Sequence, residues 1–173
     1  MRWLATIGYE GVSVEDFLAT LRQAGIVTLV DVRQVPTSRR AGYSKSRLRE
    51  ALEAEGIRYI HLVGLGDPKE GRDAARQGRY AEFRRIFTRH LKTDKAQADL
   101  KIAAELAQTD GACLLCYERQ PEFCHRSMVA DALVHSIGLE IRHIGVKAGL
   151  AKDDGNQRPR ARLGAREGLA ACR

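Results

Sequence analysis

The sequence predicts an α/β protein: a single three-layer domain with a five-stranded, mostly parallel sheet of the Rossmann-like type, followed by a basic, mobile C-terminal tail. Short apolar segments alternate with longer segments of helical periodicity along residues 1–146, as in chains built from βαβ units. Polar residues directly follow the apolar segments, where strands would end. Apolar periodicity is lost after residue 146, so residues 147–173 are expected to form the tail.

Five segments predict strands because they are short, rich in apolar and β-branched residues, and end at glycine or charged residues. They cover residues 3–9, 26–33, 57–66, 111–118 and 140–146. Five further segments have apolar residues at helical spacing, and two of them stop at Gly25 and Gly56. They cover residues 13–25, 44–56, 79–91, 95–108 and 126–138. Strands that alternate with helices require crossover connections, which produce a parallel sheet covered on both faces.

Composition indicates an ordinary water-soluble chain that carries excess positive charge. The net charge is +7, and residues 147–173 hold seven Lys/Arg against three acids, which accounts for +4 of it. A basic tail can hold nucleic acid electrostatically. No export signal or membrane-spanning run is evident, and the four cysteines are expected to be reduced thiols or ligands. A cytoplasmic location without a membrane partner is therefore expected, and the oligomeric state is left open.

Polar residues at the strand ends predict a site, because the carboxyl ends of parallel strands meet at one edge of the sheet and ligands bind there. Asp31, Cys116 and Glu118 are the candidate catalytic residues. The candidate ligand-binding residues are Tyr9, Arg33, Ser38, Arg39, His125 and Arg126. Arginines beside helix N-termini favour phosphate or carboxylate groups. We therefore expect an anionic small molecule or nucleic acid to bind at this edge.

The stretch CYERQPEFCHR, residues 116–126, holds the densest chemistry of the chain. Cys113 and Cys116 are three residues apart, so on a strand they point to opposite faces, whereas Cys116 and Glu118 share a face. Cys124 is expected at the start of a helix, where its thiol pKa would be lowered. No cofactor is predicted, since a G-x-G-x-x-G fingerprint is absent. A less favoured alternative is a zinc ion bound by Cys116, Cys124 and His125, with His61 or His143 as a further ligand.

Four blocks of the chain resemble the domain-of-unknown-function 488 family. They are TIGYEG, LVDVRQVPTSRRAGYSK, YIHLVGLG and LLCYERQPEFCHRSMVADAL, and the resemblance runs from about Thr6 to His143. It departs at GLGDPKEG, where Asp67 replaces the family's second glycine. The resemblance implies the α/β fold and brings no established activity.

Three functions stay open on the sequence alone. The first is an enzyme or binding protein that acts on an anionic, phosphate-containing ligand such as a nucleotide or nucleic acid. The second is a cysteine-dependent enzyme similar to sulfurtransferases or phosphatases, with Cys116 as nucleophile, although Glu118 and Glu122 in the following loop oppose a thiolate. The third is a non-catalytic nucleic-acid-binding module that uses the basic loop and the tail. Whether the protein is an enzyme is left undecided.

Overall fold

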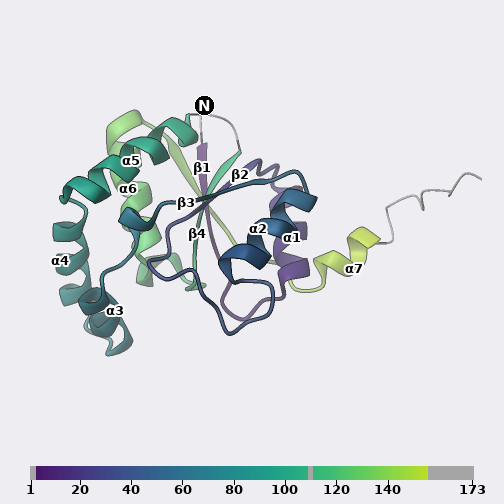
Figure 1. Cartoon of the computed structure of the whole chain (residues 1–173), viewed down its shortest axis with the longest axis horizontal. Coiled ribbons are helices and arrows are strands. Elements are labelled where there is room, and N and C mark those ends of the chain that lie inside the picture. Colours follow the sequence, from purple (N-terminus) through teal and green to yellow (C-terminus); the bar gives the residue numbers. More distant parts are fainter. Residues whose placement is uncertain (1–2, 109–110, 156–173) are drawn as a thin grey trace, which may run out of the picture.

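The computed structural model describes residues 3–108 and 111–155 (Figure 1). Its centre is a five-stranded sheet in the order β3-β2-β4-β1-β5, in which every neighbouring pair is parallel. The strands are β1 (Trp3–Gly8), β2 (Thr28–Asp31), β3 (Arg58–His61), β4 (Ala112–Cys116) and β5 (Glu140–Ile144). The predicted fold class is confirmed, and the sheet is parallel throughout rather than mostly parallel.

Helices cover both faces of the sheet and complete the three layers (Figure 1). One face carries α1 (Val14–Gln23) and α2 (Lys45–Ala54). The other carries α3 (Lys69–Arg76), α4 (Tyr80–His90), α5 (Asp94–Ala107) and α6 (His125–Ile137). Helix α3 was not predicted from the sequence, because it is short and polar and buries only Gly71 and Ala74. Two 3-10 turns, η1 (Val63–Leu65) and η2 (Pro121–Phe123), follow the carboxyl ends of β3 and β4.

The strands bury side chains on both faces, as strands between two helical layers must. In β4, Leu114 and Cys116 belong to the core under α3–α6, whereas Cys113 and Leu115 belong to the core under α1 and α2. The prediction that Cys113 and Cys116 point to opposite faces is therefore confirmed. Cys113 is a fully buried core residue, and Cys116 lies at the exit of the strand.

The carboxyl ends of β1 and β4 are tied together tightly. The backbone N–H groups of Tyr9 and Glu10 both donate to the Tyr117 carbonyl, at 3.1 and 2.9 Å. A Cβ atom at Gly8 would lie 1.9 Å from the Glu118 carbonyl oxygen, so only glycine allows this approach. The loop after Cys116 is therefore held over the end of β1, which sets the position of Glu118.

The start of the predicted tail contains a short helix, α7 (Leu150–Gly155), that lies beside α1. The Asp16 carboxylate accepts hydrogen bonds from the backbone N–H groups of Gly149 and Ala151, at 2.9 and 3.0 Å. These two bonds lower the pKa of Asp16. Residues 156–173 lie outside the described residues, so the flexibility of the tail stays a prediction.

None of the helices in residues 3–108 and 111–155 combines the length and the apolar character needed to cross a membrane.

Candidate functional site

A cleft of about 780 Å³ lies at the carboxyl ends of β1, β2 and β4, as the strand-end argument predicted. Its walls come from the loop between β2 and α2, from α3, and from the loop between β4 and α6. Five arginines line it, namely Arg33, Arg39, Arg40, Arg72 and Arg76. Only two carboxylates, Asp67 and Glu118, line it with them. The cleft therefore carries net positive charge.

Arg33 is the best-anchored of these arginines. Its Nε donates to Asp31 Oδ1 at 2.9 Å and its Nη2 to Oδ2 at 2.6 Å, which is a bidentate pair. Its Nη1 donates to the Tyr9 hydroxyl and to the Tyr43 carbonyl, both at 2.9 Å. Burial opposes the charge of Arg33, but the contacts with Asp31 outweigh it and raise the guanidinium pKa. Arg33 is thus a permanent, immobile cation in the cleft wall.

Asp31 itself lies behind the wall, fully buried. Besides Arg33, the Tyr59 hydroxyl donates to Oδ2 at 2.6 Å. Burial, followed by the neighbouring Asp31 charge, raises the pKa of Tyr59, so its proton stays on this bond. With both oxygens occupied, Asp31 is placed to orient Arg33. This geometry favours a positioning role over the catalytic role expected from the sequence.

The loop between β2 and α2 contributes the accessible charges. Ser38 Oγ accepts from the Arg40 backbone N–H at 3.1 Å and so shapes the loop. The side chains of Arg39 and Arg40 are exposed, and neither guanidinium forms a hydrogen bond or ion pair with another described residue. These two arginines are therefore available to a ligand, whereas Arg33 is largely committed to Asp31.

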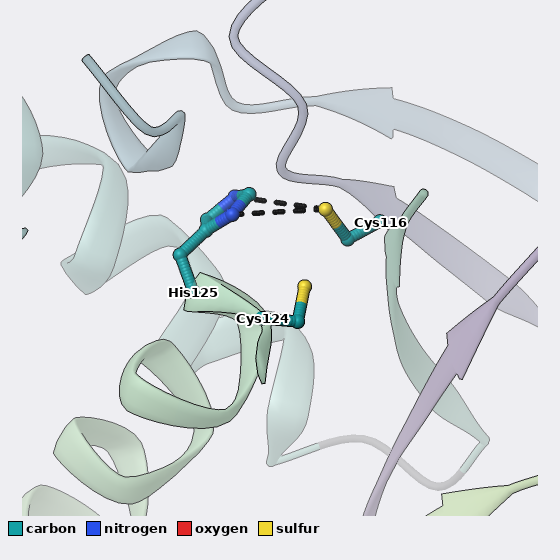
Figure 2. Close-up of side chains that lie close together, drawn as sticks. All are labelled: Cys116, Cys124 and His125. Atoms are coloured by element: carbon teal, nitrogen blue, oxygen red, sulfur yellow. Dashed lines mark hydrogen bonds between the residues drawn. The ribbon is translucent and has the colours of Figure 1, made fainter. Parts of the chain in front are cut away.

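The floor of the cleft is a cluster of Cys116, Cys124 and His125 (Figure 2). Cys116 ends β4, Cys124 immediately precedes α6, and His125 is the first residue of α6. Both thiols donate to Oε2 of Glu118, at 3.2 Å from Cys116 and 3.3 Å from Cys124. Burial raises the pKa of both thiols, so each is protonated at neutral pH in the unliganded protein. The prediction that the helix N-terminus lowers the pKa of Cys124 is wrong, because desolvation outweighs the helix dipole.

His125 is buried and its orientation is fixed. Its Nε2 lies 2.8 Å from the Val32 carbonyl, and its Nδ1 lies 3.6 Å from Cys116 Sγ. Because a carbonyl can only accept, Nε2 carries a proton, and Nδ1 is the nearer of the two ring nitrogens to the sulfur, which lies 4.0 Å from Nε2. Burial lowers the pKa of His125, but the contacts with Cys124 and Val32 and the charge of Asp67 outweigh it and raise that pKa to about 9.

Arg126 does not line the cleft, although the sequence suggested that it binds the ligand. It is 1% exposed, and its guanidinium donates to the carbonyls of Glu118 and Arg119 and to Thr6 Oγ1. Carbonyl groups in the loop between β4 and α6 need hydrogen-bond donors, and the Arg126 guanidinium supplies them for two of these carbonyls. The structure thus gives Arg126 a loop-holding position.

Asp67 is the residue that the sequence reasoning missed. It follows η1 and is buried, and its Oδ1 has no hydrogen-bond partner among the described residues. Burial raises its pKa to about 6, against the opposing charges of His125 and Arg72. Position alone could have identified it, since it comes just after the third predicted strand. An unpartnered carboxylate oxygen in a cleft is a mark of a functional site.

Aromatic residues at the rim were also missed. Tyr80 and Phe123 lie against each other with ring centroids 4.7 Å apart, and both are exposed. Tyr117, also exposed, packs against the Tyr9 ring in a T-shaped arrangement with centroids 5.3 Å apart. No periodicity marks such residues, because each comes from a separate loop or helix start.

Most of the predicted site residues are brought together. Those that line the cleft are Tyr9, Arg33, Ser38, Arg39, Cys116, Cys124, Glu118 and His125. Neither of the other histidines considered as zinc ligands joins the cluster. His61 bonds to the Arg33 carbonyl and to Lys45, and His143 bonds to Thr6 Oγ1.

The family described as Domain of unknown function DUF488 matches the chain over residues 13–133. The chain belongs to this family. The DUF488 region starts at the N-cap of α1 and ends within α6, so it contains every residue of the cleft named above except Tyr9. A search of curated proteins and a search of solved structures each gave no match. The family description assigns no activity, so a function has to be argued from the cleft.

Proposed function

We propose that this DUF488 protein binds a phosphate-containing ligand, of the nucleotide or nucleic-acid type, in the cleft at the carboxyl edge of the sheet. The observation that carries the proposal is the pair of unpartnered arginines, Arg39 and Arg40, beside the fixed cation Arg33. Guanidinium groups bind phosphate oxygens by charge-assisted, often bidentate hydrogen bonds. Arg33 is 4% exposed and already donates to Asp31, Tyr9 and Tyr43, so it contributes a fixed positive charge beside these two arginines.

The exposed aromatic rings at the rim favour a ligand that also has a flat, apolar part. Tyr117 lies at one side of the cleft and the Tyr80–Phe123 pair at another. Nucleobases stack on such rings, and each stacking contact contributes about 1–3 kcal/mol. A ligand with both a phosphate and a base would therefore use both parts of the lining. A cleft of about 780 Å³ is large enough for a mononucleotide or for part of a strand.

A cysteine-dependent transferase or phosphatase receives less support from the geometry. Such an enzyme needs a thiolate in a cradle of donors. Here Cys116 is buried, and its thiol donates to a carboxylate oxygen of Glu118, which opposes ionisation.

The test is a binding titration of the full chain with inorganic phosphate, a nucleoside monophosphate and a short single-stranded oligonucleotide. The double variant Arg39→Ala/Arg40→Ala should bind the preferred ligand at least about tenfold more weakly, which corresponds to about 1.4 kcal/mol. The matched control is Arg47→Ala/Arg49→Ala. It removes the same charge from exposed positions of α2, where both arginines pair with glutamates instead of lining the cleft.

The pattern across ligands identifies the ligand type. A steep salt dependence confined to the oligonucleotide would favour nucleic acid, because counterion release scales with the number of phosphates contacted. Equal weakening in both double variants would mean that overall charge, not the cleft, attracts the ligand, and it would refute the proposal. Failure of all three ligands to bind would refute it as well.

A further inference from the structure

The cluster on the floor of the cleft has the composition and spacing of a metal site. One donor atom each from Cys116, Cys124 and His125 lie within 4.8 Å of one another, and all three residues are buried (Figure 2). Away from these residues, no further such group of histidine, cysteine and acidic side chains is found among residues 3–108 and 111–155. Two sulfurs and one imidazole nitrogen form a donor set that suits zinc.

The orientation of His125 is a second, independent observation. Histidines that bind metals usually donate their other ring N–H to a carbonyl or carboxylate, which fixes the ring. Here Nε2–H is held by the Val32 carbonyl at 2.8 Å, and Nδ1 is the nearer ring nitrogen to Cys116 Sγ, at 3.6 Å against 4.0 Å for Nε2. With zinc–sulfur bonds of about 2.3 Å and zinc–nitrogen bonds of about 2.0–2.1 Å, a tetrahedral site places these two atoms about 3.6 Å apart. The observed spacing equals that edge of the tetrahedron.

The Glu118 carboxylate lies against the two sulfurs of the cluster. Its Oε2 lies 3.2 Å from Cys116 Sγ and 3.3 Å from Cys124 Sγ, so it faces both sulfurs at once. Without a metal, this oxygen accepts the two thiol protons. A zinc ion would displace the two thiol protons and the Nδ1 proton of the His125 imidazolium and release all three to solvent, and its charge would balance two thiolates in a buried position.

The surrounding structure holds these groups in place. Arg126 fixes the Glu118 carbonyl, and Gly8 lets β1 pack directly against the same peptide. The start of α6 carries Cys124 and His125 side by side. Ligands fixed before the metal arrives are a requirement for a tight site.

We infer that Cys116, Cys124 and His125 bind a zinc ion, with the Glu118 carboxylate at the fourth position, toward the cleft. The inference goes beyond the proposed ligand binding and does not depend on it. The chain spacing of these residues differs from that of zinc knuckles and fingers, which place a short turn between two cysteines.

The test uses the full chain purified with a reductant and no added chelator. Elemental analysis should find about one zinc per chain. After chelation, cobalt(II) should bind and give the thiolate-to-cobalt charge-transfer and tetrahedral visible bands of a sulfur-ligated site. Cys116→Ser and Cys124→Ser should each abolish these bands. Cys113→Ala, which removes a buried thiol from the opposite face of β4, should keep them. Glu118→Gln should weaken zinc binding by roughly 10–100-fold without abolishing it.

A second test, cysteine alkylation, keeps Cys116, Cys124 and His125 intact, so it does not depend on variants that fail to fold. Zinc should slow the alkylation of Cys116 and Cys124 at least about tenfold, as mapped by mass spectrometry in a Cys172→Ala background. An unchanged alkylation rate would overturn the inference. A wild-type chain that contains no zinc and gives no cobalt bands would overturn it as well. A chain that takes up neither metal but readily forms a Cys116–Cys124 disulfide would identify a redox pair instead.

Discussion

Replacing Arg126 with methionine should destabilise the fold strongly while leaving the arginine-lined wall of the cleft in place. Methionine keeps most of the unbranched, apolar stem and removes the guanidinium group. The guanidinium donates to the Glu118 and Arg119 carbonyls and, at 3.4 Å, weakly to Thr6 Oγ1. The substitution therefore leaves two loop carbonyls without their donors.

The magnitude follows from the two carbonyl contacts. A hydrogen bond that involves a charged group contributes about 1.5–3 kcal/mol, so the two together contribute about 3–6 kcal/mol. The substitution also removes the desolvation cost of the buried guanidinium, and this gain offsets part of the lost hydrogen-bond energy. We expect a net loss of about 3 kcal/mol, a large share of the roughly 5–15 kcal/mol of a typical domain. The melting temperature should fall by about 6–12 °C.

The assay is urea denaturation followed by circular dichroism, with phosphate affinity measured on the folded protein. Arg85→Met is the matched control, because Arg85 is exposed on α4 and forms no hydrogen bond or ion pair with another described residue. It should change the free energy of unfolding by less than about 0.5 kcal/mol. If Arg126→Met leaves stability unchanged and weakens phosphate binding by about tenfold, Arg126 contacts the ligand and the structural account is refuted.

Three further substitutions test other features of the site and its supports. Gly8→Ala should lower the free energy of unfolding by about 2–4 kcal/mol, because the new Cβ would lie 1.9 Å from the Glu118 carbonyl oxygen. Its control is Gly145→Ala, where a Cβ would have no atom within 4 Å, and thermal denaturation should show almost no change. Asp67→Asn should stabilise the protein at pH 8, because burial raises the Asp67 pKa from 3.8 to about 6 and the ionised form is disfavoured in the folded state. That pKa shift corresponds to about 3 kcal/mol of folding free energy, and solvent screening at the cleft wall reduces the expected gain in stability to about 2 kcal/mol. The gain should disappear below about pH 4, where wild-type Asp67 is protonated in both states, and a pH-independent gain would contradict this account. Asp16→Ala should release the start of α7 and speed hydrogen exchange at the Gly149 and Ala151 amides, and unchanged exchange there would show that other contacts hold α7.

Much of the architecture could be predicted from the sequence because it depends on local pattern. Apolar segments of strand length alternate with helical periodicity, and each expresses a preference of a few neighbouring residues. Parallel strands then share one carboxyl edge, which is why Arg33, Cys116, Glu118 and His125 were expected in one place and do line one cleft. Helix α3 escaped prediction because its eight residues bury too little to leave an apolar stripe.

The roles within the site depend on contacts between distant segments, which no local pattern encodes. Arg126 and Arg39 are both arginines near a helix start, yet one is buried against loop carbonyls and the other is exposed at the cleft. Cys124 has the position that lowers a thiol pKa, but the surrounding layers desolvate it and raise that pKa. Burial and hydrogen-bond partners are properties of the packed chain, because they exist only once helices and strands far apart in sequence have closed around a side chain.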